Sequence, residues 1–319
     1  MLAINEKALG PDDRDVAGAL NNLAALYDNQ DRYAEAEPLL KRALAIQEKM
    51  LGPDHPDVAT ALNTLTLAYA NEGRNDEAEP LYKRALAIRE KAVGPDHPDV
   101  AISNLALLYS NEGRYAEAEP LFKRALTISE NTLGAGHPFV VDTLNDLADL
   151  YSKQGRYADA LPLVRRAISN KSAATWAALP VLFGAQAAKL ISVDEALDNG
   201  LNVVQRALQT SAGQALNALA VRFAAGNDQL AQLVRKDQDL SGEAASLDKA
   251  TIAAVSSEPA KRDAAAEKRL RDRITAIAKE RDDLQSILKR EFPDYAALSD
   301  PEPLRVTDIR PVLADDEAR

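Results

Sequence analysis

The stretch D-E-A-E-P-L-Y-K-R-A-L (76–86) decides the fold, because versions of it recur along the first half of the chain. The related stretches are A-E-A-E-P-L-L-K-R-A-L (34–44), A-E-A-E-P-L-F-K-R-A-L (116–126) and A-D-A-L-P-L-V-R-R-A-I (158–168). Their prolines follow one another at intervals of 42, 40 and 42 residues: Pro38, Pro80, Pro120 and Pro162. A period of this length is typical of a solenoid, in which each unit buries its apolar face only by stacking on the next.

Each repeat is predicted to contain two helices. In the second repeat the apolar face of the first helix consists of Val58, Leu62, Leu65 and Tyr69. Gly73 ends this helix, because glycine adopts the left-handed conformation at little cost. A second helix follows with a buried stripe from Ala78 to Ile88, and G-P-D-H-P (94–98) separates it from the next repeat. The third repeat lacks two residues near Ala101-Ile102, which predicts a shortened start of its first helix.

The composition excludes several classes of function. The chain has 319 residues, with 38 Lys and Arg against 49 Asp and Glu, so its formal net charge is −11. Nucleic-acid binding needs a basic surface, and an anionic membrane would repel this chain. With no apolar run long enough to span a bilayer and no signal peptide at its start, we expect a cytoplasmic protein. The absence of cysteine excludes disulfides, thiolate metal sites and a cysteine nucleophile.

Two longer helices are predicted in the last third of the chain. One heptad series follows Gly226-Asn227 and consists of Leu230, Leu233, Leu240, Ala244 and Leu247. The other follows a turn near residue 257 and consists of Leu270, Ile274, Ile277, Leu284 and Leu288. These series predict an antiparallel coiled helical hairpin over 226–292. Asp237 and Arg281 occupy the skipped heptad positions, where they either pair or extend separately into solvent at a wet seam.

The repeat resembles the tetratricopeptide repeat (TPR), in the 42-residue form found in kinesin light chains and many bacterial proteins. The matching parts of the second repeat are L-N-T-L-T-L-A-Y (62–69), G-R (73–74), E-A-E-P-L-Y-K-R-A-L-A-I-R-E-K (77–91) and G-P-D-H-P (94–98). The resemblance implies an all-α, right-handed TPR superhelix (an α-solenoid) over residues 1–170, with four full repeats and the end of an earlier one. Residues 171–225 are interpreted as divergent TPR-like capping helices.

A second resemblance covers roughly residues 200–319. The stretches R-F-A-A-G-N-D-Q-L-A-Q-L-V-R-K-D-Q-D-L (222–240), R-E-F-P-D-Y-A-A-L (290–298) and P-E-P-L-R-V-T-D-I-R-P-V-L-A-D-D-E-A (301–318) are similar to the segment before the peptidase domain of bacterial TPR–CHAT proteins. CHAT domains are caspase-like and use a Cys–His pair. This chain has no cysteine, so the resemblance implies a neighbouring domain and transfers no catalytic residue. Residues 293–319 are interpreted as a linker toward that domain.

Asparagines recur at two positions of the first helices. The first row follows a buried apolar residue and consists of Asn21, Asn63, Ser103 and Asn145. The second row lies two residues after the tyrosine and consists of Asn29, Asn71, Asn111 and Lys153. First helices line the concave groove in TPR folds, so the resemblance implies that both rows face a peptide or protein ligand there. A carboxamide offers a donor and an acceptor, which suits the backbone of an extended peptide. The alternative is that these residues cap helices or contact the next repeat.

Two other recurring groups are interpreted as structural. His55, His97 and His137 each precede a proline, and they lie one repeat apart instead of converging on one ion, so we predict helix starts and no metal site. The basic pairs either form an anion-binding stripe or are neutralised by glutamates on the same helices, and the spacing favours neutralisation. These pairs are Lys41-Arg42, Lys83-Arg84, Lys123-Arg124 and Arg165-Arg166.

We therefore predict a non-catalytic scaffold that binds a protein or peptide and needs no cofactor. The sequence has no glycine-rich phosphate loop, convergent histidine or carboxylate cluster, or nucleophile that would indicate an enzyme. In one hypothesis the chain is the recognition or regulatory arm of a larger protein with a downstream CHAT domain. In the other it is a free-standing adaptor or assembly scaffold, like the TPR units of kinesin light chains. The sequence leaves the partner's identity and the oligomeric state open.

Overall fold

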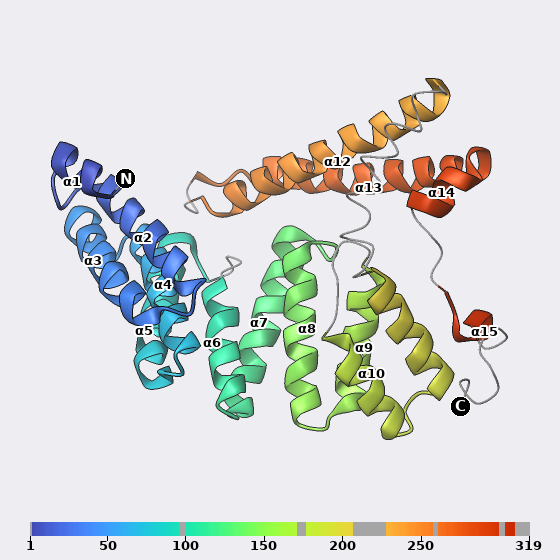
Figure 1. The fold of residues 1–319 in the computed structure, drawn as a ribbon, viewed down its shortest axis with the longest axis horizontal. Coiled ribbons are helices and arrows are strands. Elements are labelled where there is room, and N and C mark those ends of the chain that lie inside the picture. The colour runs from blue at the N-terminus through green and yellow to red at the C-terminus, as the bar shows by residue number, and fades with distance from the viewer. Residues whose placement is uncertain are drawn as a thin grey trace. The chain divides into compact units, whose positions relative to one another are not determined.

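The structure is a computed structural model that describes residues 2–95, 100–170, 177–206, 228–257, 261–299 and 304–309. Within these ranges the regular elements are helices and no strand occurs, which confirms the predicted all-α fold (Figure 1). The chain divides into two compact units. One consists of Met1–Ile128 with Ser256–Lys261, and the other of Ser129–Val255 with Arg262–Arg319.

The first unit consists of stacked helix pairs, as the repeat predicts. After α1 (Leu2–Leu9) come α2 (Arg14–Asp28) with α3 (Tyr33–Leu51), α4 (Pro56–Asn71) with α5 (Asn75–Val93), and α6 (Val100–Asn111) with the beginning of α7 (Tyr115–Leu133). Helix α3 also packs on α4, and α5 packs on α6, so each pair stacks on the next. The predicted solenoid is therefore confirmed.

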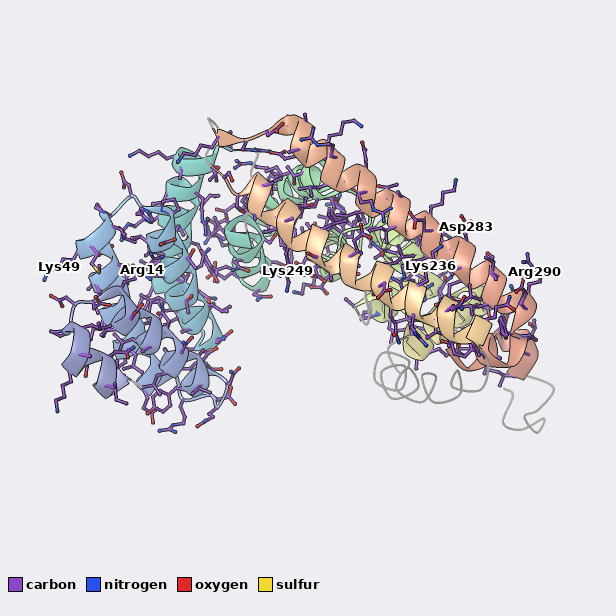
Figure 2. The ribbon with its side chains drawn as sticks, turned by 90° about the horizontal axis from the view of Figure 1, so that it is seen from above. Arg14, Lys49, Lys236, Lys249, Asp283 and Arg290 are labelled. Atoms are coloured by element: carbon purple, nitrogen blue, oxygen red, sulfur yellow. The ribbon has the colours of Figure 1, made fainter. Side chains whose placement is uncertain are left out.

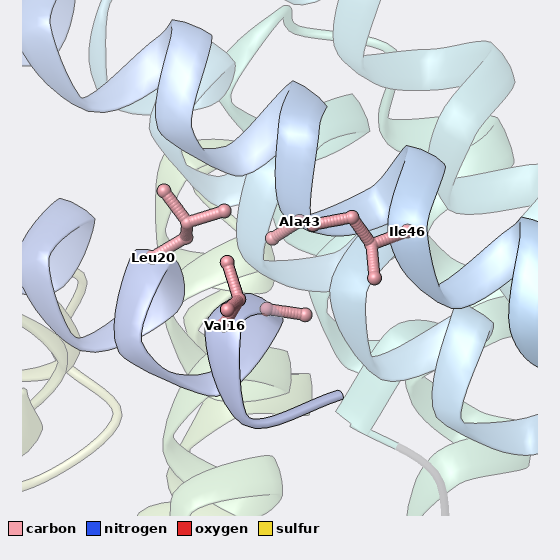
Figure 3. Packing of buried hydrophobic residues seen from close by; sticks show 5 residues of the cluster. Val16, Leu20, Ala43 and Ile46 are labelled. Atoms are coloured by element: carbon pink, nitrogen blue, oxygen red, sulfur yellow. The ribbon is translucent and has the colours of Figure 1, made fainter. Parts of the chain in front are cut away.

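The core of this unit repeats with the sequence. One cluster joins α2 to α3 and includes Val16, Leu20, Ala43 and Ile46 (Figure 3). Its equivalent joins α4 to α5 and includes Val58, Leu62, Ala85 and Ile88. Ala43 and Ala85 are both fully buried, so the small side chain sets how closely the two helices of a pair approach. A larger residue at either position would overpack the contact by about 1–3 kcal/mol.

The third repeat keeps its register despite the two missing residues. Ile102 packs with Ala125 and Ile128, and Leu105 and Tyr109 are buried like their counterparts in the second repeat. Helix α6 spans 12 residues, where α4 spans 16. The residues before α6, 96–99, lie outside the described residues.

The second unit continues the helix pairs with α8 (Pro138–Lys153) and α9 (Tyr157–Ser169). Helix α10 (Ala178–Ala187) packs on both α8 and α9, as the first helix of another pair would. Residues 193–206 are helical and come next along the chain. These two helices occupy the segment interpreted as capping helices, whose remaining parts, 171–176 and 207–225, lie outside the described residues.

The predicted hairpin consists of α12 (Asp228–Val255) and α13 (Ala264–Glu291). Leu240 of α12 packs with Ile277 and Leu284 of α13, and the exposed charges Lys236, Lys249, Asp283 and Arg290 project from the two helices (Figure 2). The Arg281 guanidinium donates to the Asp237 carboxylate at 2.9 and 3.2 Å. Of the two interpretations of these heptad positions, the structure therefore shows pairing.

The hairpin contacts the chain around the loop that precedes α8. In that loop G-A-G-H (134–137) replaces the G-P-D-H of the second repeat, so a proline and an acid give way to small residues. His137 lies 3.3 Å from the Asp248 carboxylate of α12, and the Arg271 guanidinium of α13 donates to the carbonyl of Thr132 at 3.0 Å. A cavity of about 410 Å³ remains between the loop and the hairpin.

The segment expected to be a linker contains two further helices, α14 (Pro293–Ser299) and α15 (Val306–Ile309). Helix α14 packs on α13, and Tyr295 together with Phe292 contacts the cluster of Leu230 and Leu288. These apolar contacts partly bury both aromatic side chains against the hairpin.

Candidate peptide-binding surface

The turn inside each repeat sets the angle between its two helices. In the second repeat Gly73 has a φ of +75°, and the N–H of Arg74 donates to the carbonyl of Tyr69 at 2.8 Å. This bond closes the end of α4 with a left-handed residue, the geometry that glycine permits. Arg74 is thereby placed at the start of α5.

The Arg74 side chain then joins two repeats. Its guanidinium donates to Glu37 of the preceding repeat at 2.8 Å. It also donates to Glu72 at 2.8 Å and to Glu77 at 2.7 Å. The same guanidinium lies 4.2 Å from the ring centre of Tyr69, whose hydroxyl donates to Glu37 at 3.1 Å. Helix α3 is therefore tied to the turn between α4 and α5.

The same arrangement recurs one repeat later. Arg114 donates to Glu79 of the preceding repeat at 2.7 Å, and to Glu112 and Glu117 at 3.0 and 2.7 Å. Its guanidinium lies 4.0 Å from the ring centre of Tyr109. We call these two arrangements, centred on Arg74 and Arg114, the arginine joints. Sequence reasoning missed them, although the recurring G-R and the second glutamate of A-E-A-E-P were visible signals.

The arginine joints lower the pKa of the two glutamates that come from the preceding repeats, Glu37 and Glu79. The hydrogen bond from Arg74 is the main cause that brings the pKa of Glu37 from 4.5 to about 2, with Lys41 contributing next. Arg114 and Lys83 have the same effect on Glu79, whose pKa is also about 2. Both carboxylates are therefore charged in the folded chain well below the pH at which they protonate when unfolded.

We expect the arginine joints to make stability depend on acid. A carboxylate with a depressed folded pKa stabilises the fold above its unfolded pKa, here near 4.5, and this contribution is lost as the pH falls toward 2. A variant with Glu37→Gln and Glu79→Gln should unfold at a lower temperature than the wild type at pH 7, and the difference should shrink between pH 4.5 and pH 2. Calorimetry across this range measures both curves, and curves that stay parallel would contradict the effect.

The first predicted row of asparagines is only partly accessible. Asn21, Asn63 and Asn145 are half-buried, and Ser103 is 6% exposed. Their side-chain oxygens are buried and have no hydrogen-bond partner among the described residues. The side-chain oxygen of each asparagine in this row is therefore inaccessible to solvent in this structure.

The second predicted row is exposed on every first helix. Asn29 directly follows α2 as its C-cap residue, Asn71 is the last residue of α4, and Asn111 is the last residue of α6. In α8 the equivalent residue is Lys153, which pairs with Asp149 at 2.9 Å. This row therefore presents polar groups to solvent at the same end of each first helix.

Further residues lie on the same helix face as the second row, at spacings of three and four. We call this face of α2, α4 and α6 the first-helix stripe. Its exposed members are Asn22, Ala25, Asn29, Thr60, Leu67, Asn71 and Asn111, and its half-buried members are Thr64, Asn104 and Leu107. It is polar and uncharged, with Leu67 45% exposed near its middle.

The equivalent face of α8, in the second unit, is acidic. It carries Asp142, Asp146 and Asp149. Burial raises the pKa of Asp146 to about 7, and the neighbouring charges of Asp142 and Asp149 add to the effect. This face therefore suits a different ligand chemistry from the uncharged stripe of the first unit.

Two histidines cap helices as the sequence favoured, and the lysines of three basic pairs are neutralised within their own helices, whereas the arginines of these pairs bond to glutamates of other helices. The Nδ1 atoms of His55 and His137 each accept from the backbone N–H two residues later at 3.1 Å, as caps of α4 and α8, whereas His97 lies outside the described residues. Lys41, Lys83 and Lys123 each pair with a glutamate four residues earlier at 2.6–2.7 Å. In the described part of the chain, no group of three or more candidate ligands gathers as a metal site would need.

The comparison with known proteins identifies the family. The tetratricopeptide repeat model matches residues 2–49, 15–91 and 99–173, just over half of the chain. The chain therefore belongs to the tetratricopeptide repeat family, whose fold typically serves as a non-catalytic scaffold for protein interaction.

Solved structures with a similar fold come from kinesin-light-chain-type repeats. A kinesin light chain candidate of Podosopora anserina with nearly identical TPR-like repeats is 24% identical, with a TM-score of 0.52, over 62% of this chain and 98% of that one. A point variant of the same protein is 26% identical, with a TM-score of 0.51, over 61% and 95%. BtubC (BKLC) from P. vanneervenii is 21% identical, with a TM-score of 0.47, over 69% and 77%. Among curated proteins, none matches this chain.

The helices give no sign of a membrane span. Within the described ranges, none is both long enough and apolar enough to cross a bilayer.

Proposed function

We propose that the first-helix stripe binds an extended peptide segment of a partner protein. The observation that supports this is the recurrence of an exposed asparagine at one structural position on three successive first helices: Asn29, Asn71 and Asn111. Side-chain amides that recur along one face of stacked repeats can each bond the backbone of one extended ligand.

The uncharged character of the stripe limits the ligand further. Leu67 and Leu26 are 45% and 58% exposed, which offers apolar contacts beside the amides. The stripe's own side chains carry no charge, although Arg89 of α5 donates to the Thr60 hydroxyl at 2.7 Å beside them. We infer a ligand segment that is read through its backbone and a few apolar side chains.

Removing two of the exposed amides should weaken binding without unfolding the chain. In a variant with Asn29→Ala and Asn71→Ala, each lost hydrogen bond costs about 1 kcal/mol, so affinity should fall about 30-fold. The measurement is calorimetric titration with a peptide selected on the wild-type chain from a random library, together with thermal unfolding of both proteins. Unchanged affinity would remove the stripe from the binding surface.

The covered row provides a matched comparison, because it changes the same residue type on the same kind of helix. If Asn63 and Asn145 also contact the ligand, Asn63→Ala with Asn145→Ala lowers affinity and leaves the unfolding temperature unchanged. If they support the fold, the unfolding temperature falls while binding persists. The two results assign this row to the groove or to the packing of the repeats.

An adaptor role is the form of this function that the similar folds support. The Podosopora anserina repeats share the stacked helix pairs described above, and they belong to a kinesin light chain candidate. In such an adaptor the stripe would hold a cargo or assembly partner. Light scattering of the full chain with and without a captured partner tests whether the complex is a simple one-to-one adaptor pair.

A regulatory role beside a peptidase domain is the second candidate. It rests on the similarity of the stretches 222–240, 290–298 and 301–318 to the segment that precedes CHAT domains. In that arrangement the stripe would receive the signal, and the hairpin would transmit it to the neighbouring domain. The gene sequence downstream of the codon for Arg319 tests this proposal, and a downstream reading frame without paired His and Cys residues would contradict it.

A further inference from the structure

The helical residues 193–206 carry a row of polar side chains on one face. Asp198, Asn202 and Gln205 follow one another at spacings of four and three, which places them on the same side of the helix. All three are half-buried, so another part of the chain covers this face.

The chain's own C-terminal segment is bound to this row through its backbone. The N–H of Val306 donates to the Asp198 carboxylate at 2.8 Å, and the N–H of Leu304 donates to the Gln205 side-chain oxygen at 2.9 Å. The later residue of the segment meets the earlier residue of the helix, so the two run antiparallel. Val306 is only 9% exposed, so its aliphatic side chain adds an apolar anchor beside its own hydrogen bond.

The middle member of the row is not used by this segment. The side-chain oxygen of Asn202 is buried and has no hydrogen-bond partner among the described residues. The segment residue between the two bound N–H groups is Arg305, and its own N–H donates to the Asp308 carboxylate at 2.9 Å. A buried acceptor without a donor costs free energy, so the row offers one bond more than the segment supplies.

We propose that Asp198, Asn202 and Gln205 form a second peptide site, separate from the first-helix stripe, and that residues 304–309 occupy it as a built-in competitor. Its partner is a peptide segment of another protein that donates backbone N–H groups to Asp198 and Gln205. The partner places an aliphatic side chain where Val306 lies and supplies the missing donor to Asn202. The chain's own segment keeps the site closed until such a partner displaces it.

The test uses the full-length chain and a fluorescent synthetic peptide of residues 303–310, P-L-R-V-T-D-I-R. In the wild type the tethered segment competes at an effective concentration of about 1 mM. Val306→Asp places a second carboxylate beside Asp198 and should release the segment. If the peptide binds the open site with a Kd of about 0.1 mM, its apparent affinity for Val306→Asp should be about tenfold higher than its affinity for the wild type. Fluorescence anisotropy measures this change.

A second variant removes only the donor. Val306 is the first residue of α15, where proline's fixed φ fits and its missing N–H is tolerated, so Val306→Pro deletes the bond to Asp198 and keeps the helix start. Its peptide affinity should lie between those of the wild type and Val306→Asp. Thr307→Ala changes an exposed residue of the same segment and should behave like the wild type.

Variants of the helical residues 193–206 distinguish recognition of the peptide from simple release of the segment 304–309. Adding Asp198→Ala to Val306→Asp should weaken the peptide about fivefold or more, because it removes an acceptor of the peptide's N–H. Adding Asn202→Leu should leave the affinity unchanged, because this peptide makes no bond there. Equal binding to the wild type and to Val306→Asp, no binding to Val306→Asp, or no effect of Asp198→Ala would each overturn the proposal. The variants of Asn29 and Asn71 leave this site untouched, so its failure is distinguishable from failure of the stripe.

Discussion

A variant with Tyr82→Ala is expected to lose about 3–5 kcal/mol of unfolding free energy. Tyr82 lies in α5 and is 1% exposed, so truncation removes an aromatic ring from the core and leaves a cavity that neighbouring helices fill only in part. Because each repeat is stabilised mainly by its neighbours, the loss should spread to the adjacent pairs. Urea unfolding followed by circular dichroism measures the change.

The chain offers its own control for this position. One repeat later the equivalent residue is Phe122, which is fully buried. Tyr82→Phe should therefore keep the ring and lose less than about 1 kcal/mol. Burial raises the pKa of Tyr82 to about 12, so the phenol is neutral over the pH range of the experiment and its charge does not enter the comparison. Equal stability of the alanine and phenylalanine variants would show that this core position does not hold the stack together.

Replacing Gly184 with alanine should also destabilise the chain, by about 1–3 kcal/mol. Gly184 lies within α10, where alanine normally gains about 1 kcal/mol over glycine. Here a Cβ at Gly184 would lie 2.1 Å from Cε1 of Tyr157, which is the first residue of α9, so the ring or the helix must move. The close approach of α10 to α9 requires the absence of a side chain.

Gly200 is the control, because it is another helical glycine in the same unit. A Cβ there would meet Leu179 at 3.5 Å, an ordinary contact, so Gly200→Ala should be neutral or stabilising by up to about 1 kcal/mol. In a double-mutant cycle, Tyr157→Ala should remove most of the penalty of Gly184→Ala. Additive effects of the two substitutions would mean that the ring is not what excludes a side chain from Gly184.

The helix pairs could be predicted because their signals are local. Apolar spacing, a glycine after three of the four first helices (Asp31 takes its place after α2) and a proline-containing break recur within about 40 residues. The heptad series of the hairpin is a signal of the same kind, and it also placed Asp237 close enough to Arg281 for pairing to be one of two interpretations. The structure shows pairing, because the Arg281 guanidinium donates to the Asp237 carboxylate at 2.9 Å.

The exposed amides could be predicted less well, because consecutive helical residues differ by only about 100° in direction. Asn21 and Asn22 are both polar, and the packing of the neighbouring helices, which the sequence does not show, decides which one is covered. The end of each first helix is less ambiguous, since Asn29, Asn71 and Asn111 lie where the helix leaves the core. This row is the one that the structure shows to be exposed.

The remaining features could not be predicted because they join residues far apart in the chain. The contact of Asp198 with Val306 spans more than a hundred residues, and neither residue belongs to a recognisable motif. In the sequence alone, Gly184 indicates only a less stable helix. The structure shows that the Tyr157 ring lies too close to leave room for a side chain there. Such contacts depend on how divergent helices pack, for which no repeat supplies a template.

The arginine joints also determine how this array can be recombined. Arg74 belongs to one repeat and its partner Glu37 to the repeat before it, so a single repeat cut out of the chain carries half of two different joints. A unit grafted into another array would need a host glutamate to receive its arginine and a host arginine to receive its glutamate. The unit that can be exchanged between such proteins therefore contains the interface between two neighbouring repeats. A designer keeps this interface intact by cutting the chain between the two helices of a pair.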